Sequence, residues 1–183
     1  MFVAIRFTLL ILVSMGLLYP LALTGLGQAF FPQQANGSLI HNATGQTIGS
    51  SLIGQAFTRP EYFHPRPAAN GYDAANSGGS NLGPTSKKLI DRITVDTSGY
   101  QQKNGAKQPI PVDAVTASAS NLDPHISVAN ALRQVPRVAH ARNVSPKRIK
   151  ALVLQLTEKP LFSEAPYLNV LTLNLALETK NSF

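Results

Sequence analysis

The feature that most constrains this chain is a run of 25 residues, Phe7–Phe31, that carries no charged side chain. As a continuous α-helix this run rises about 37 Å, enough to cross a hydrocarbon core of about 30 Å with some tilt. Proline is tolerated in membrane helices, so Pro20 does not exclude a span, and we expect a kink near Tyr19 and Pro20. Residues 1–31 are therefore predicted to be a cytoplasmic N-terminus and a transmembrane anchor helix.

A cleaved signal peptide is the alternative interpretation of the same residues. Arg6 is then its basic region, Phe7–Leu18 its apolar region and Thr24–Gly27 its cleavage site. Both interpretations place the rest of the chain outside the cytoplasm. Arg6 precedes the apolar run and no Lys or Arg follows it until Arg59, and this asymmetry favours a cytoplasmic N-terminus.

Residues 32–183 are predicted to form one small extracytoplasmic α+β domain with a small sheet. Apolar islands at Leu39-Ile40, Ile48 and Leu52-Ile53 indicate short strands between loops rich in Gly, Ser, Asn and Pro. Apolar and polar residues alternate over Val112–Thr116 and over Asn169–Leu177, which indicates two further strands.

About three helices are expected in the same domain. The first covers Lys87–Val95 and is followed by a polar loop, Thr97–Pro109. The second begins after a capping Ser127, and Pro136 should kink or split it. The third begins at Ser145-Pro146, a capping residue followed by proline at the first helical position. The expected core positions are Leu89, Ile90, Ile93, Val128, Ala131, Leu132, Val135, Val138, Ile149, Leu152, Val153 and Leu156.

The loop that most suggests binding consists of Ser77, Gly78, Gly79, Ser80 and Asn81. Glycines flanked by hydroxyl and amide side chains can present backbone N–H groups to an anion. The same composition is also typical of a tight turn in which Gly78 and Gly79 adopt positive φ. Both interpretations of this loop stay open at the level of sequence.

Asp123 and His125 lie at a turn and are the other candidate site residues. With His64 and Asp73 they could form a polar site, but the four are scattered and lack the spacing of metal ligands. The chain has no cysteine, and it contains no nucleophile elbow, zinc-protease helix or phosphate-binding lysine loop. We therefore expect no catalytic residue, no metal site and no cofactor bound by this chain alone.

A basic stretch between Asp123 and Glu158 contains no acidic residue and no aromatic residue. Single-strand nucleic-acid binders need aromatic side chains for stacking, so a nucleic-acid partner is not expected. The stretch is interpreted as a solvated helical face, with docking on an acidic partner or on lipid headgroups as the alternative. Its members are Arg133, Arg137, Arg142, Lys147, Arg148 and Lys150.

Eight blocks follow one another in a specific order along the chain. They are Tyr19-Pro20, Ser51–Phe57, Tyr62–Pro67, Ser77–Pro84, Val115–Ser120, Leu122–Ser127, Gln134–Ala139 and Asn169–Leu177. In this order and spacing they resemble the C subunit family of the bacterial Kdp potassium-transporting ATPase. The departures are Asn121 where a glycine is usual, Ala68 where a serine is usual, and Phe162–Pro166 where a glycine-rich approach to the last block is usual.

The resemblance implies an uncleaved single span in the bacterial inner membrane and three protein partners. These are a channel-like potassium-translocating subunit, a P-type ATPase subunit and a very small helical subunit. It implies a non-catalytic accessory role, described as that of a catalytic chaperone that raises the ATP affinity of the pump subunit. ATP with Mg²⁺ and potassium would be bound by the complex, and Ser77–Pro84 and Thr116–Ser127 would serve docking. An exported, anchored module that binds a small anion at Ser77–Asn81 is the alternative.

Overall fold

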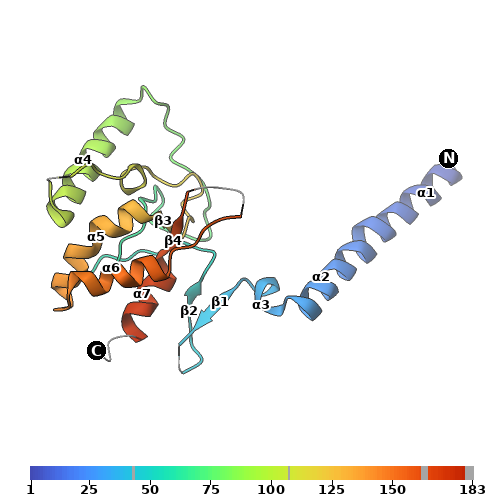
Figure 1. The fold of residues 1–183 in the computed structure, drawn as a ribbon. Helices are drawn as coiled ribbons and strands as arrows, with labels where there is room; N and C mark the ends of the chain where they lie inside the picture. The colour runs from blue at the N-terminus through green and yellow to red at the C-terminus, as the bar shows by residue number, and fades with distance from the viewer. Residues whose placement is uncertain (43, 107, 162–164, 180–183) are drawn as a thin grey trace. The chain divides into compact units, whose positions relative to one another are not determined.

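A computed structural model describes residues 1–42, 44–106, 108–161 and 165–179. The chain forms two compact units, residues 1–50 and residues 51–183. Helices and short strands both occur, which confirms the predicted α+β class (Figure 1). The predicted boundary between anchor and domain at residue 31 stays a prediction.

The first unit begins with a long apolar helix. It consists of α1 (Phe2–Val13), a π-helical turn (Ser14–Leu18) and α2 (Tyr19–Phe30). The whole helix, Phe2–Phe30, is 29 residues long, or about 43 Å, so its length and composition fit one membrane span. The π turn lies just before Pro20, which lacks the N–H that would bond to the preceding turn of this continuous helix.

A short helix and a hairpin complete this unit. After α3 (Pro32–Ala35), strands β1 (Leu39–His41) and β2 (Thr47–Ser50) pair antiparallel, with Leu39 opposite Ser50. The expected strands at Leu39-Ile40 and Ile48 are confirmed. The expected strand at Leu52-Ile53 is wrong, because these residues lie in a turn.

The described part of the second unit contains four α-helices and one two-stranded sheet (Figure 1). The helices are α4 (Lys87–Asn104), α5 (Val128–Ala141), α6 (Pro146–Gln155) and α7 (Val170–Thr179). Strand β3 (His125–Ser127) pairs antiparallel with β4 (Tyr167–Asn169), so that Ile126 faces Leu168. A 3₁₀ turn, Val112–Ala114, precedes β3.

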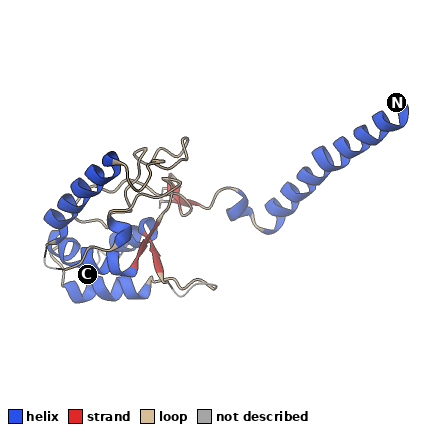
Figure 2. Cartoon of the chain, turned by 90° about the horizontal axis from the view of Figure 1, so that it is seen from above, coloured by secondary structure: helices blue, strands red, loops and turns tan. Residues whose placement is uncertain are grey.

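The hydrophobic core lies between α5, α6, α7 and the β3–β4 pair. Residues 51–82 form no helix or strand in the described structure, and they run as the long tan loops of Figure 2. Phe63 from this segment is nevertheless fully buried at the centre of the core. The core residues are Phe63, Ile126, Ala131, Val135, Val138, Ala139, Ile149, Leu152, Val153, Leu168, Val170, Leu173 and Leu177.

Two further predicted strands are wrong. The Asn169–Leu177 segment begins at the end of β4 and continues as α7, where the Asn169 side chain accepts the Thr172 N–H and caps the helix. Val112–Thr116 contains the 3₁₀ turn instead of a strand. That turn brings Asp113 to Ser127, whose N–H and Oγ both donate to its carboxylate at 2.8 Å.

The three predicted helices exist, with changes in detail. Helix α4 extends to Asn104 and replaces most of the expected loop, and Ile90 is 55% exposed, so it is not a core residue. Helix α5 continues through Pro136 without splitting, and its cap is confirmed by Ser127, whose side chain accepts from the Asn130 N–H. Helix α6 begins with proline at its first position, as expected, although Ser145 makes no side-chain capping bond.

Candidate functional site

The segment before the candidate loops is held in place by two buried amide side chains. Asn174 accepts from the Phe63 N–H at 2.8 Å and donates to the Phe63 carbonyl at 3.0 Å. Gln134 makes the same pair of bonds with His64, at 2.7 and 3.1 Å. These amides satisfy backbone groups that a neighbouring strand would otherwise pair. The extended segment is therefore fixed without belonging to a sheet.

The loop of residues 77–81 is fastened to a second loop, residues 117–121. The Gly78 N–H and the Ser77 hydroxyl both donate to the Ser120 carbonyl, each at 3.2 Å. A Cβ atom placed on Gly79 would lie 2.9 Å from the Ala119 carbonyl oxygen, so only glycine fits without a shift. The expected positive φ at Gly78 and Gly79 is wrong; Asn81 adopts it instead, with φ of 53°.

A hollow of about 600 Å³ opens beside this loop, and we call it the glycine-loop hollow. Its lining includes all five predicted site residues, 77–81, together with Lys88 and Arg92 from α4. No acidic residue is among the described residues that line it. The hollow therefore presents a positive charge next to the glycine-rich loop.

Asn121 forms part of the same hollow and occupies a special backbone position. Its φ is 60°, which asparagine tolerates better than most residues and glycine tolerates best. Its side chain is 2% exposed, and its Oδ1 accepts from the Ala69 N–H. The asparagine that departs from the family pattern thus keeps a left-handed turn and adds an amide.

The structure brings Asp123 and His125 together, but away from the glycine-loop hollow. Asp123 accepts from Arg66 Nη1 at 2.6 Å and from the His125 N–H at 2.9 Å. Burial alone would raise the pKa of Asp123, but the hydrogen bonds from His125 and Arg66 outweigh it and lower that pKa to about 2. The His125 ring packs edge-on against the Tyr167 ring, with 4.6 Å between the ring centroids. This arrangement ties β3 to β4 and to the Arg66 segment.

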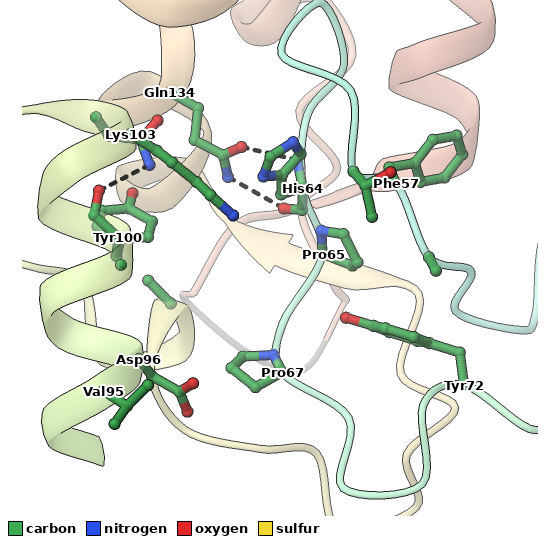
Figure 3. Close-up of a pocket in the computed structure, with 15 residues that line it drawn as sticks. Phe57, His64, Pro65, Pro67, Tyr72, Val95, Asp96, Tyr100, Lys103 and Gln134 are labelled. Atoms are coloured by element: carbon green, nitrogen blue, oxygen red, sulfur yellow. Dashed lines mark hydrogen bonds between the residues drawn. The ribbon is translucent and has the colours of Figure 1, made fainter. Parts of the chain in front are cut away.

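His64 lies in a separate cavity of about 380 Å³ between α4 and the extended segment (Figure 3). Gln134 reaches the His64 backbone there, while Tyr72 and Tyr100 lie on opposite sides of the cavity. Burial and the nearby Arg137 lower the pKa of His64 to about 4, and burial raises the pKa of Tyr72 and of Tyr100 to about 12. None of these three groups changes protonation near neutral pH.

The basic stretch is not one solvated face. Arg137 Nη1 donates to the Pro60 and Tyr62 carbonyls at 2.5 and 2.9 Å, and Arg142 Nε donates to the Glu61 carbonyl at 2.7 Å. Arg133 caps the end of α4 by donating to the Asn104 carbonyl at 3.0 Å. The solvated-face interpretation is wrong for these three arginines, whereas Lys147, Arg148 and Lys150 are exposed.

The glycine-rich loop is recognisable in the sequence, whereas Lys88, Arg92 and Asn121 were not predicted to lie beside it. Lys88 and Arg92 stand four positions apart and share one side of a helix, which is a readable signal. Which loop that side would face is not readable from spacing. The Phe162–Pro166 departure lies partly outside the described residues, and Asp73 and His64 are not brought to Asp123.

Comparison with known proteins places these features in a family. The family model described as "K+-transporting ATPase, c chain" matches residues 1–179. The chain belongs to the KdpC family. It is 51% identical over 179 residues to the potassium-transporting ATPase KdpC subunit of Koribacter versatilis, covering 96% of this chain and 92% of the relative.

Other KdpC relatives agree. The KdpC subunit of Caulobacter vibrioides is 52% identical over 172 residues, covering 92% of this chain and 87% of that protein. The KdpC subunit of Mycobacterium bovis is 50% identical over 181 residues, covering 96% and 95%. This KdpC chain is therefore a subunit of a potassium-transporting ATPase, and its apolar helix suggests single-pass anchoring in a membrane.

Proposed function

We propose that this chain is a non-catalytic, membrane-anchored accessory subunit that assembles the channel-like and P-type ATPase subunits of a potassium uptake complex. The observation that carries the proposal is the family match over residues 1–179, which includes the apolar helix and both candidate loops. A very small helical subunit and membrane lipid are the remaining partners.

The docking surface is formed by residues 77–84 and 116–127. These loops are hydrogen-bonded to each other. The second loop is also bonded to residues 51–67, because the Ser118 N–H donates to the Pro67 carbonyl and the Gly54 N–H donates to the Leu122 carbonyl. Thr116, Ala119 and Ser120 are nevertheless exposed. Loops that a scaffold holds rigid while their tips stay exposed are common recognition surfaces, and this supports a docking role.

A matched pair of substitutions tests the docking surface in the assembled complex. Ala119→Glu adds a charge to the second loop, and Ala106→Glu adds the same charge to another exposed loop. We expect Ala119→Glu to lower co-purification of the channel-like subunit, while Ala106→Glu leaves it at the wild-type yield. Equal yields from the two variants would place the docking surface elsewhere.

The second unit lies on the periplasmic side of the inner membrane, with the N-terminus in the cytoplasm. Arg6 precedes the apolar helix, and no basic residue follows it until Arg59, which supports this orientation. A reporter active only in the cytoplasm, fused after Phe183, should be silent, and the same reporter fused before Met1 should be active. The reverse pattern would reject the orientation.

The chain influences ATP use by coupling and without chemistry of its own. It would raise the ATP affinity of the pump subunit, as a catalytic chaperone does, by docking better on the nucleotide-competent state. A coupling free energy of about 1 to 3 kcal/mol changes affinity roughly 5- to 150-fold. Contacts of ordinary strength at the docking surface suffice for such an effect.

A further inference from the structure

The glycine-loop hollow contains two basic side chains, and one of them, Lys88, has no acidic partner among the described residues. Arg92 makes no hydrogen bond within the described structure, and its ion pair with Asp96 is a long one, with 3.9 Å between Nε and Oδ2. Lys88 is exposed and forms no ion pair with a described residue, in contrast to Lys87, which is bonded to Asp91 at 2.7 Å. Like charges at i and i+4 on a helix repel, so Lys88 and Arg92 together favour an anion between them.

The hollow also contains polar donors that have no partner among the described residues. The Asn121 side chain is 2% exposed, and while its Oδ1 is bonded to Ala69, its Nδ2 makes no hydrogen bond there. The backbone N–H groups of residues 79–82 likewise make none. No described residue therefore competes with a ligand for these donors.

We propose that the glycine-loop hollow is a binding site for a phosphate-class oxyanion. Arg92 and Lys88 supply the charge, while Asn121 Nδ2 and the N–H groups of residues 79–82 supply neutral donors. Guanidinium groups match the geometry of phosphate oxygens, and a row of backbone N–H groups is a common anion cradle. The volume of about 600 Å³ admits either inorganic phosphate or the phosphate of a lipid headgroup.

The site shares residues 79–82 and Asn121 with the proposed docking surface, so anion binding is measured without the partner subunits. The first measurement uses the full chain, purified without its partners in a neutral detergent, and follows thermal unfolding while inorganic phosphate replaces chloride at constant ionic strength. Saturable stabilisation is expected, and phosphate at about ten times its Kd should lower the unfolding constant about 11-fold.

Three variants separate the site from the general stabilising effect of phosphate. Arg92→Gln should abolish the saturable part, and Lys88→Gln, at an exposed position that cannot disturb the core, should weaken phosphate binding several-fold. Lys87→Gln removes the same charge one residue away, outside the hollow, and should bind as the wild type does. Equal responses from all four proteins would overturn the proposal.

A second arm identifies the source of the phosphate group. The full chain is placed in nanodiscs of phosphatidylcholine or of phosphatidylglycerol, and its unfolding is compared with that of Lys88→Gln. The site is assigned to a lipid headgroup if phosphatidylglycerol stabilises the wild type but not Lys88→Gln, and if free phosphate competes with this stabilisation. Stabilisation by free phosphate alone assigns it to the soluble ion, and stabilisation by neither rejects the site.

Discussion

At the scale of single residues, two buried amides fix the path of the segment that contains Phe63 and His64. Asn174 and Gln134 each bond both the N–H and the carbonyl of one residue in an otherwise unpaired segment. Both amide side chains are at most 2% exposed. A hydrophobic residue of similar size would fit the space but leave buried backbone groups without partners, which costs more than the lost bonds alone.

Asn174→Leu should therefore destabilise the second unit by about 2–4 kcal/mol, because it leaves two buried backbone groups of Phe63 unpaired. Gln102→Ala is the control, because Gln102 is exposed on α4 and should change stability by less than about 0.5 kcal/mol. Urea unfolding of the two variants measures the difference. An Asn174→Leu variant with the same free energy of unfolding as the wild type would show that the amide is dispensable.

His64 makes stability depend on pH in a defined window. Burial, followed by Arg137, lowers its folded pKa from 6.5 to about 4, so the unfolded chain takes up a proton first as pH falls. The stabilisation from neutral His64 is therefore complete above pH 6.5 and is lost as pH falls toward about 4, at no more than roughly 1.4 kcal/mol per pH unit.

The test compares the pH dependence of urea unfolding in His64→Gln and in His140→Gln. His64→Gln should have a flatter stability curve than the wild type between pH 4 and 6.5. His140 is exposed, and His140→Gln should keep the wild-type slope. If the two variants have the same slope, His64 is not the group responsible.

At the scale of elements, Gly79 and Gly78 offer a comparison within one loop. A Cβ at Gly79 meets the Ala119 carbonyl oxygen at 2.9 Å, whereas a Cβ at Gly78 has no atom within 4 Å. Gly79→Ala should thus separate the two loops and lower the free energy of unfolding by about 1–3 kcal/mol. Gly78→Ala should lower it by less than about 0.5 kcal/mol. Thermal unfolding of both variants distinguishes a close approach from a merely flexible loop.

The helices were predictable where local signals agreed with packing. Ser145-Pro146 marks the start of α6, and Ser127 caps α5 as its sequence indicates. The error at α7 has a physical cause. Its leucines alternate, which suits a strand, but Val170, Leu171, Leu173, Asn174 and Leu177 are the buried positions and follow a helical period. Asn174 is one of these buried positions and bonds the Phe63 backbone.

The candidate site was only partly predictable, for a related reason. The glycine-rich loop stands out by composition. The hollow beside it is also lined by Arg92, Lys88 and Asn121, which come from a helix and from another loop. Segments far apart in sequence are joined here by bonds such as Ser77 to Ser120, which leave no periodic pattern. Family resemblance supplied the order of the blocks but not their contacts.

At the scale of the whole molecule, the chain combines a unit that fits a membrane span with a unit that presents rigid loops. The described residues contain no group of three or more His, Asp or Glu placed to hold a metal ion. Triphosphate binding in pumps and kinases uses a cradle together with Mg²⁺ and its acidic ligands. The glycine-loop hollow offers donors for one phosphate group but no carboxylate for the metal and no aromatic side chain for a base.

The full chain alone should therefore bind ATP with Mg²⁺ no more tightly than it binds inorganic phosphate, and it should not hydrolyse ATP. Titration calorimetry of the detergent-solubilised chain measures the first, and phosphate release measures the second. In the assembled complex, Ser80→Ala and Asn81→Ala should leave the number of bound nucleotides unchanged, because any gain in ATP affinity is transmitted through the partner subunits. Micromolar binding of ATP by the chain alone, lost in both variants, would instead make the glycine-rich loop a nucleotide site.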